Sequence, residues 1–348
     1  MNKTHTESSL RRTFLKDAAF ASTVLFAGSE RGAGAEAAPD WKKQVGLALY
    51  TVRDLMATDF EGILAKVAQM GYKEIEPANG YNNMAPKAFR SMLDRYGLRM
   101  PSTHTNYPDG AGAELERQLE AQQIMGLRYT EIISAASRRT TVGADRPPGN
   151  LAPGSYYNPA THVVYNSFRE LGAFGPYQPP AKLDAVKRRA AELNANGKIA
   201  AKFGIKLFVH NHTGEFERLA DDDRTTYDIL LAETDPELVT MQLDIGWAYI
   251  AGVDPIAMFG KNPGRYELWH VKDVFGTKTV DPKLSPNERV SRMAFAPVGA
   301  GQIDYKKVFG HASVAGLKHF FVEQDNAASF GDSLAAARVS FEGLSRVL

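Results

Sequence analysis

Short apolar runs alternate with amphipathic segments along most of the 348-residue chain. The apolar runs have the length of buried strands, and the segments behind them carry apolar residues at helical spacing. The pattern predicts eight strands, at 45–50, 71–76, 98–103, 127–134, 206–212, 239–244, 266–272 and 318–323. The helices expected after them are 60–70, 86–96, 113–125, 183–203, 226–232, 255–259, 305–312 and 333–347.

Eight successive strand–helix units predict a single-domain α/β fold, the (β/α)8 or TIM barrel. A doubly wound sheet is the competing architecture, but the Gly-rich phosphate loop of nucleotide-binding sheets does not follow the first predicted strand. Residues 137–180 are rich in Gly, Pro, Tyr, Asn and Arg, and they delay the helix that should follow the fourth strand. We therefore expect one barrel over 38–348 with an insertion at 137–180.

The first 37 residues do not share this pattern. Arg11 and Arg12 precede Thr-Phe-Leu-Lys, and the apolar stretch 18–28 is too short to span a bilayer. An Ala-Glu-Ala cleavage site ends directly before Ala38. These features predict a twin-arginine signal peptide over 1–37, and hence a protein exported to the periplasm or otherwise out of the cytoplasm.

The composition limits the kinds of partner that the protein binds. Lys and Arg together number 41 against 40 Asp and Glu, so no net charge attracts nucleic acid or an anionic membrane. No other apolar run approaches membrane-spanning length, so we expect no membrane contact once the signal is removed. Cysteine is absent, which means that any metal must be held by nitrogen and oxygen. A small molecule is the expected partner.

Polar side chains gather at the predicted carboxyl ends of the strands, where TIM barrels place their active sites. Seven of the eight strands end in a group that can bind metal, transfer protons or hold a sugar hydroxyl. These residues are Tyr50, Arg53, Glu76, His104, His210, His212, Asp244, His270, Lys272, Glu323 and Asp325. The joint pattern, more than any one residue, predicts a functional site.

Three of these residues end strands that are otherwise apolar: Asp244, His270 and Glu323. On successive strands they would converge at the barrel axis, where a divalent metal explains how their charges coexist. A metal-free hydrogen-bonded network is the alternative. The fourth ligand should come from the fifth strand, where register favours His210; Glu215 is the rival, because a loop carboxylate can fold back.

Two residues beyond the ligands have two interpretations each. Trp247 follows Asp244 closely and either packs in the core or stacks on the apolar face of a sugar. Lys272 either pairs with a ligand carboxylate or acts as an acid near the substrate. Asp273 alternates to the other face and is expected to be structural.

Six motifs occur in a fixed order along the chain, and they include His-Asn-His-Thr-Gly-Glu-Phe and Trp-His-Val-Lys-Asp. They occupy 46–54, 210–216, 242–247, 269–273, 298–304 and 322–325. Together they resemble the sugar phosphate isomerase/epimerase family of xylose isomerase-like TIM barrels. The resemblance covers nearly all of the chain after the predicted signal peptide.

The resemblance implies one divalent ion, with manganese preferred and cobalt, zinc or magnesium as other candidates, held by Asp244, His270 and Glu323. Many members carry glutamate where His210 stands, so the resemblance leaves open whether His210 or Glu215 is the fourth ligand. The chain departs from the family at position 48, where alanine replaces an expected glutamine. It also departs in the insertion, which we expect to form a lid, a substrate wall or a contact between copies in a homo-oligomer.

Isomerisation, epimerisation and β-elimination of keto-sugars share one first step, the removal of a proton next to a carbonyl. We therefore expect an isomerase or epimerase of an unphosphorylated sugar or keto-sugar, since no Gly-rich anion loop is present. The alternative is a lyase or dehydratase acting on a 3-keto-glycoside or an inosose. A non-catalytic sugar-binding barrel is less expected, and a three-zinc endonuclease is disfavoured by neutral charge and too few histidines.

Each candidate residue has an expected role in this chemistry. Glu215 or His212 should act as base or acid on one side of the substrate, with Glu323 serving as both ligand and base on the other. Lys272 and His104 should hold or protonate substrate oxygens. The residues expected to bind the substrate are His104, Trp247, Glu76 and Arg53.

Overall fold

The computed structural model describes residues 40–77, 84–105, 112–132, 156–158, 163–165, 180–276, 283 and 293–348. The chain divides into Met1–Pro39 and Asp40–Leu348, and the described residues all belong to the second unit. The predicted signal peptide lies outside the described residues, as does most of the predicted insertion. Both therefore stay predictions.

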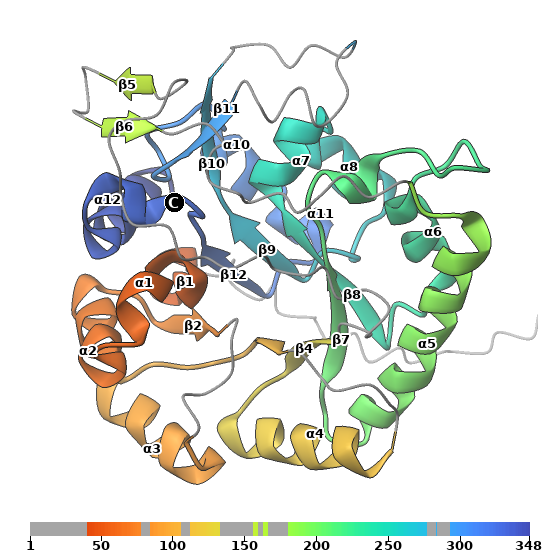
Figure 1. Cartoon of the computed structure of the whole chain (residues 1–348), viewed down its shortest axis with the longest axis horizontal. Coiled ribbons are helices and arrows are strands. Elements are labelled where there is room, and N and C mark those ends of the chain that lie inside the picture. The colour runs from red at the N-terminus through yellow and green to blue at the C-terminus, as the bar shows by residue number, and fades with distance from the viewer. Residues whose placement is uncertain are drawn as a thin grey trace, which may run out of the picture. The chain divides into compact units, whose positions relative to one another are not determined.

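Eight strands of the described chain form one parallel sheet (Figure 1). In spatial order they are β2 (Glu74–Glu76), β1 (Gly46–Ala48), β12 (His319–Val322), β9 (Leu268–Val271), β8 (Val239–Asp244), β7 (Lys206–His210), β4 (Tyr129–Ile132) and β3 (His104–Thr105). The two outer strands meet, because Glu74 forms a parallel bridge with Arg99 and the His104 N–H donates to Pro77 O at 2.9 Å. The sheet closes on itself, and the predicted (β/α)8 barrel is confirmed.

Helices lie on the outer side of the sheet (Figure 1). They are α1 (Arg53–Met56), α2 (Phe60–Met70), α3 (Pro86–Tyr96), α4 (Ala113–Met125), α5 (Leu183–Ala201), α6 (Thr226–Glu233), α7 (Ile245–Ala251), α8 (Pro255–Lys261), α10 (Tyr305–Phe309), α11 (Ala312–Ala315) and α12 (Ser333–Val347). Helix α2 shows why the predicted bounds hold, since the Asp59 side chain accepts from the Gly62 N–H at its start and Gly71 ends it with a φ of 111°. Within the described residues, no helix combines the length and apolar character needed to cross a membrane.

Helix α7 and two antiparallel strand pairs were not predicted. Helix α7 begins immediately after Asp244, whose Oδ1 accepts from the Trp247 N–H at 2.8 Å. Strands β10 (Asp273–Gly276) and β11 (Met293–Ala296) pair antiparallel in a stretch where the apolar pattern indicated a loop. A second antiparallel pair, β5 (Tyr156–Asn158) with β6 (Val163–Tyr165), lies inside the range predicted as an insertion.

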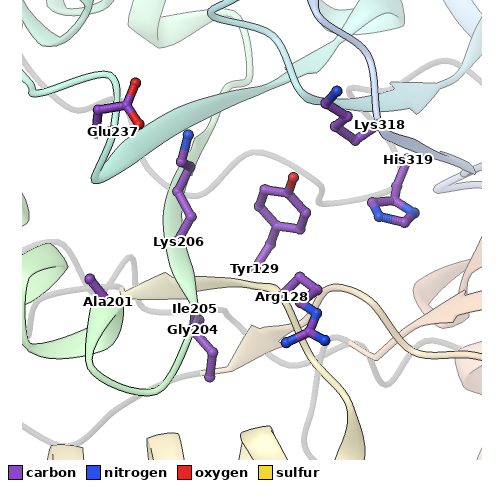
Figure 2. Close-up of a pocket in the computed structure, with 9 residues that line it drawn as sticks. All are labelled: Arg128, Tyr129, Ala201, Gly204, Ile205, Lys206, Glu237, Lys318 and His319. Carbon is purple, nitrogen blue, oxygen red and sulfur yellow. The ribbon is translucent and has the colours of Figure 1, made fainter. Parts of the chain in front are cut away.

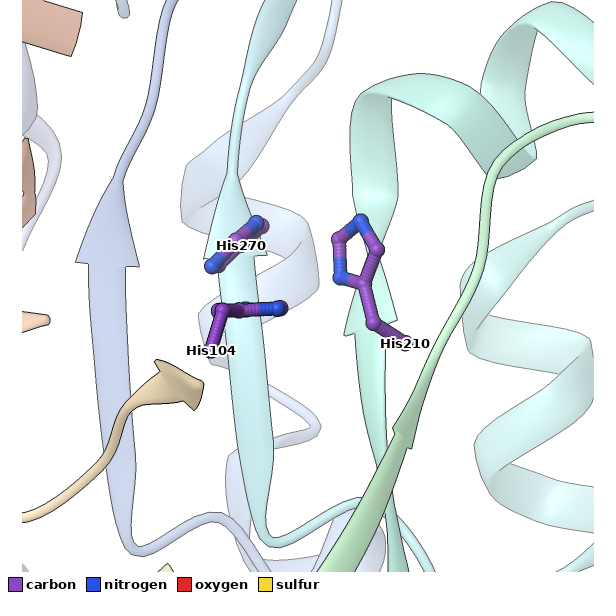
Figure 3. A group of neighbouring side chains, drawn as sticks. All are labelled: His104, His210 and His270. Atoms are coloured by element: carbon purple, nitrogen blue, oxygen red, sulfur yellow. The ribbon is translucent and has the colours of Figure 1, made fainter. Parts of the chain in front are cut away.

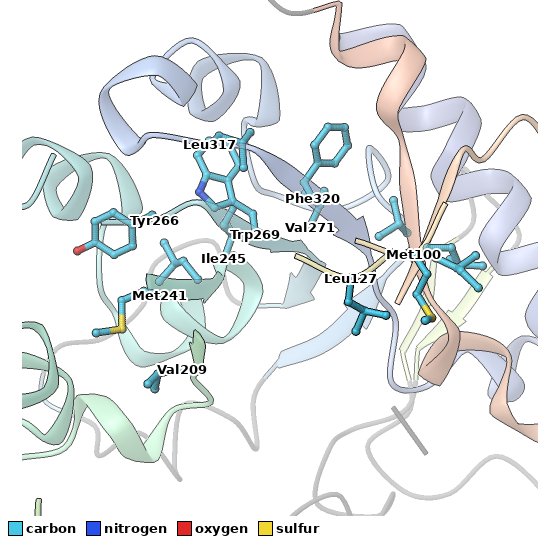
Figure 4. Close-up of a cluster of buried hydrophobic side chains, with 14 of the residues drawn as sticks. Met100, Leu127, Val209, Met241, Ile245, Tyr266, Trp269, Val271, Leu317 and Phe320 are labelled. Atoms are coloured by element: carbon cyan, nitrogen blue, oxygen red, sulfur yellow. The ribbon is translucent and has the colours of Figure 1, made fainter. Parts of the chain in front are cut away.

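The side chains of the barrel strands alternate between two layers. In β7, Leu207 and Val209 face the helices, whereas Phe208 belongs to a separate inner cluster. Figure 4 shows part of the helix-facing core, which includes Met241, Trp269, Val271 and Phe320. The inner cluster is formed by Ala48, Tyr129, Phe208, Leu268 and Phe321. Ala48, the departure from the expected glutamine, is therefore a buried packing residue.

The inner cluster lies below the polar strand ends. His210, His270 and Glu323 each stand two residues after a member of that cluster, on the same face of the same strand or its continuation. The apolar layer thus closes the barrel interior beneath the polar residues, and the alternation directs their side chains to the axis.

Candidate metal centre

The carboxyl ends of β8, β9 and β12 bring Asp244, His270 and Glu323 together. Asp244 pairs with His270 in the strand register, and Glu323 follows Val322, the partner of Val271. One ligand atom from each of the three side chains lies within 4.8 Å of the other two, and all three side chains are buried. His270 Nδ1 is 2.7 Å from Glu323 Oε2 and 3.7 Å from Asp244 Oδ2.

The chemistry of this group fits a divalent ion. Within the described residues, the buried atoms Asp244 Oδ2 and His270 Nδ1 make no hydrogen bond of normal geometry. Their second polar atoms are used: Asp244 Oδ1 caps α7, and His270 Nε2 donates to Glu76 Oε2 at 2.6 Å. A carboxylate that holds the far side of an imidazole is the usual support of a metal ligand, because it orients the ring and its lone pair.

The electrostatics of His270 agree with this interpretation. Burial by itself lowers the pKa of His270, but the charges of Glu323 and Glu76 outweigh burial and raise that pKa well above its usual value. The same negative surroundings that stabilise an imidazolium stabilise a bound cation.

His210 stands beside this group as a neutral imidazole. Its Nδ1 lies 3.1 Å from Gln242 Oε1, and its Nε2 is 3.9 Å from Asp244 Oδ2. Burial, and after it the positive charge of the neighbouring His270, hold the pKa of His210 well below its usual value. A neutral ring with Nε2 turned toward Asp244 has the form of a fourth nitrogen ligand.

Glu215, the rival for the fourth position, lies in the 3₁₀ turn Gly214–Phe216. Its Oε2 accepts a hydrogen bond from the backbone N–H of His212 at 2.8 Å. In the described part of the chain, the three-residue groups with metal-ligand geometry are Asp244–His270–Glu323 and His104–His210–His270, and neither includes Glu215. The geometry therefore favours His210.

Lys272 is an ion-pair partner of carboxylates, which is the first of the two roles expected for it. Its Nζ lies 3.0 Å from Asp244 Oδ2, 2.9 Å from Glu323 Oε2 and 2.7 Å from Asp325 Oδ2. Burial by itself lowers the pKa of Lys272, but these three carboxylates raise it well above its usual value. The sequence placed Asp325 at a strand end without a role; the structure makes it a partner of this buried ammonium.

Glu76, expected to bind the substrate, is enclosed beneath the site with 1% of its surface exposed. Its Oε1 accepts from the Ser102 hydroxyl and from Gln242 Nε2, and its Oε2 accepts from His270 Nε2. Both oxygens are engaged, so Glu76 supports His270 from below. Burial alone raises the pKa of Glu76, but the neighbouring His104 and His270 lower it below its usual value, which keeps the group ionised.

His104 lies among three acceptors, one of which is Glu76 Oε2, 3.3 Å from His104 Nε2. Its Nδ1 donates to Glu131 Oε2 at 2.7 Å and its Nε2 to Gln242 Oε1 at 2.7 Å. Burial lowers the pKa of His104, but Glu76 and Glu131 together raise it to about 10. His104, at 16% side-chain exposure, is therefore an imidazolium at the edge of the site.

The remaining predicted residues surround the centre. Trp247 is 1% exposed, and its ring packs edge-on against that of Phe295, with 4.7 Å between the ring centres. Of the two expected roles, it therefore has that of a core residue. The ring of His212 lies 5.5 Å from that of Trp247. Arg53 Nη2 donates to Asp325 O at 2.8 Å, which ties the end of the first barrel strand to the end of the eighth.

Asp273 is structural, as expected. Its carboxylate accepts from the backbone N–H groups of Val274, Gly299, Gly301 and Ile303. A Cβ added to Gly301 would lie 2.2 Å from Asp273 Oδ1, so only glycine fits there. This contact explains the motif at 298–304.

Three supporting residues were not predicted: Asn211, Gln242 and Glu131. Asn211 Oδ1 accepts from the Asp244 N–H at 3.0 Å and its Nδ2 donates to Asp244 O at 3.3 Å, which joins β7 to β8 beside the ligand. Gln242 and Glu131 hold the histidines. In the sequence, Gln242 and Glu131 stand out only as polar residues on the inward face of a barrel strand.

A pocket of about 390 Å³ lies elsewhere, at the amino ends of the strands. Figure 2 shows it around Tyr129, Lys206 and His319, which stand at the beginnings of β4, β7 and β12. Because TIM-barrel active sites lie at the opposite end, this pocket is not part of the candidate metal centre.

Eight parallel strands around a buried carboxylate–imidazole group define a TIM barrel with a candidate metal centre at the strand carboxyl ends. The family model described as Xylose isomerase-like TIM barrel matches residues 64–338. The chain belongs to this family, and the resemblance found in the six motifs is confirmed.

Two relatives have the same name. The chain is 33% identical to an inosose dehydratase of Geobacillus thermodenitrificans over 141 residues, which are 39% of this chain and 46% of that protein. It is 31% identical to an inosose dehydratase of Clostridium botulinum over 253 residues, which are 72% of this chain and 76% of that protein. The first match thus spans less than half of the relative's length.

Solved structures share the fold. A sugar phosphate isomerase/epimerase from Parabacteroides distasonis superimposes with a TM-score of 0.60 at 18% identity, covering 87% of this chain and 93% of that one. A xylose isomerase-like TIM barrel protein from Mycobacterium smegmatis, in complex with magnesium, gives 0.56 at 15% identity, covering 88% and 97%. At these identities the likeness shows the fold alone.

Proposed function

We propose that this barrel is a metal-dependent lyase of the dehydratase type, which removes water from an unphosphorylated keto-polyol such as an inosose. The similarity to two inosose dehydratases supports elimination. From the sequence alone an isomerase or epimerase is the first expectation and a dehydratase the second, and the names of the relatives favour the dehydratase.

One observation supports the metal dependence: the ligand atoms of the buried side chains Asp244, His270 and Glu323 converge within 4.8 Å of one another. His210 Nε2 is the proposed fourth ligand. These residues would hold a divalent ion, which would supply Lewis-acid chemistry at the substrate carbonyl. We propose manganese, to be compared with cobalt, zinc and magnesium.

The chain's own residues orient the reaction. Lys272 Nζ holds the carboxylates of Asp244 and Glu323 in place and adds positive charge beside the substrate oxygens. Trp247 and Phe295 form an apolar wall that excludes water from that charge.

His212 is the proposed proton carrier, because its ring lies 5.0 Å from that of His210 and is partly exposed. Its imidazole takes the proton from the carbon next to the carbonyl, and the electrons of that C–H bond form a carbon–carbon double bond. The neighbouring C–O bond breaks, and the hydroxyl leaves as water with the proton that His212 returns. Glu215 Oε2 fixes the backbone of His212 for this transfer.

The test uses protein stripped by chelator and reloaded with each of the four metals, with an inosose as substrate. We expect the product to be lighter by one water and to absorb in the ultraviolet through its conjugated carbonyl, with no turnover in chelator. Unchanged mass with solvent deuterium at the carbon next to the carbonyl would instead identify an isomerase or epimerase. Binding without either change would identify a sugar-binding barrel.

A further inference from the structure

Three histidine rings lie side by side at the strand ends (Figure 3). The ring centres of His104 and His210 are 5.1 Å apart, those of His104 and His270 are 5.2 Å apart, and those of His210 and His270 are 4.6 Å apart. The three also have metal-ligand spacing. Whether they share an ion depends on which ring nitrogens carry protons, because a protonated nitrogen cannot bind metal.

The side chain of Gln242 connects these rings to the base of the site. It belongs to β8 next to His210 in the strand register, and it is fully buried. Its amide nitrogen donates to Glu76 Oε1 at 2.8 Å. Its amide oxygen lies 2.7 Å from His104 Nε2 and 3.1 Å from His210 Nδ1.

The orientation of this amide follows from Glu76. Glu76 Oε1 already accepts from the Ser102 hydroxyl, and Glu76 Oε2 accepts from His270. An ionised carboxylate can only accept hydrogen bonds, so the amide nitrogen of Gln242 must face it. The amide oxygen then faces both imidazoles, and an oxygen without a hydrogen requires a donor on each of them.

We propose that Gln242 is a positioning residue that sets the tautomers of the site: it holds a proton on His210 Nδ1, so that His210 presents Nε2 to the metal position, and a proton on His104 Nε2, so that His104 stays outside the ligand set. His104 Nδ1 faces the Glu131 carboxylate and is protonated as well. Of the three histidines, His104 is therefore a hydrogen-bonded support and not a ligand, and the protein binds one ion per chain.

This inference rests on the metal centre of the proposed function, but its first test needs neither substrate nor metal. Wild-type protein with ¹⁵N-labelled histidine, treated with chelator, is studied by long-range ¹H–¹⁵N correlation, which distinguishes the two tautomers. Signals are assigned with His210→Gln and His104→Gln. We expect His210 with its proton on Nδ1 and His104 with both nitrogens protonated; a His210 proton on Nε2 would overturn the proposal.

Two substitutions separate the donor and acceptor roles of Gln242. Gln242→Glu keeps oxygens facing the histidines but loses the donor to Glu76, so the His210 tautomer should persist. Gln242→Met loses both, so His210 should become a mixture of tautomers and the affinity for manganese or zinc, measured by competition with a coloured chelator, should fall roughly 10–100-fold. Gln122→Met removes another buried glutamine, on α4, as the matched control and should change neither.

Retention of the wild-type tautomer and metal affinity in Gln242→Met would refute the positioning role. If Gln242→Met fails to fold, the wild-type tautomers and Gln242→Glu still decide the question. Two ions per wild-type chain would show that His104 joins a metal site. A confirmed tautomer together with absent dehydratase activity would refute the proposed reaction and leave this inference standing.

Discussion

Lys272 Nζ lies 2.7 Å from Asp325 Oδ2, and the ammonium group also contacts the carboxylates of Asp244 and Glu323. One buried cation thus faces the two buried carboxylates of Asp244 and Glu323 and the partly buried carboxylate of Asp325. Removing one partner of a buried ion pair leaves an uncompensated charge, which typically costs about 3–5 kcal/mol.

Lys272→Met should therefore lower the free energy of unfolding of metal-free protein by about that amount. Added divalent metal should stabilise the variant more than the wild type, because the ion replaces the lost counter-charge. Urea unfolding with chelator and with manganese measures both effects. The double variant Lys272→Met/Asp325→Asn should recover part of the lost free energy of unfolding. If metal-free Lys272→Met is as stable as wild type, the buried ion pairs do not stabilise the protein.

Asp244→Asn should abolish tight metal binding while preserving the fold. Asparagine caps a helix about as well as aspartate, so α7 keeps its first turn, but the neutral amide is a poor metal ligand. Metal affinity from calorimetry and the melting temperature check the two parts. Asp254→Asn is the matched control, since Asp254 caps α8 in the same way away from the site, and it should leave metal affinity unchanged.

His210→Gln and Glu215→Gln should behave differently. His210→Gln removes the proposed fourth ligand, so metal affinity should fall by at least tenfold. Glu215→Gln should bind metal normally and keep most of its turnover, because its amide oxygen still accepts the hydrogen bond from the backbone N–H of His212. Metal competition and kcat measured on both variants test the assignment, and the reverse result would make Glu215 the ligand.

The charge of His104 should make stability depend on pH above neutrality. Its folded-state pKa of about 10 exceeds the usual 6.5, so the ion pairs with Glu76 and Glu131 stabilise the protein fully below about pH 6.5. This contribution, on the order of a few kcal/mol, is lost as the pH rises toward 10.

The free energy of unfolding, measured with urea between pH 6 and pH 10, should decline with pH in wild type. It should depend less on pH in His104→Gln. His311→Gln replaces a histidine at the start of α11, away from the site, and should keep the wild-type profile. If the free energy of unfolding falls equally with pH in wild type and in His104→Gln, His104 is not the cause of the decline.

The predicted export signal is testable without the barrel's activity. Replacing Arg11 and Arg12 by lysine should leave full-length protein in the cytoplasm of a host with a twin-arginine pathway. In wild type we expect a periplasmic product that begins at Ala38, identified by cell fractionation and intact mass. Equal export of the variant would show that another signal directs the protein.

Much of the barrel could be predicted because the physical pattern is local. Apolar spacing in 60–70, 86–96 and 113–125 matches α2, α3 and α4 to the residue, since a glycine that ends each helix is visible in the sequence. Strand alternation also predicted that Asp244, His270 and Glu323 would converge, because parallel strands in a barrel share one carboxyl end. The apolar pattern predicts no strand between 272 and 305, because β10 and β11 have only four residues each.

The sequence by itself determined the barrel, its family and the three residues at the centre of the site. Only the tertiary structure decided how these residues are supported. Gln242 and Glu76 are 166 positions apart, so no local pattern could pair them. The proposal of His210, and not Glu215, as fourth ligand rests on the same kind of fact, because the Glu215 oxygen accepts from a backbone N–H and the His210 ring lies against Gln242. Hydrogen bonds across a barrel interior depend on which strands face one another, and that is a property of the closed sheet.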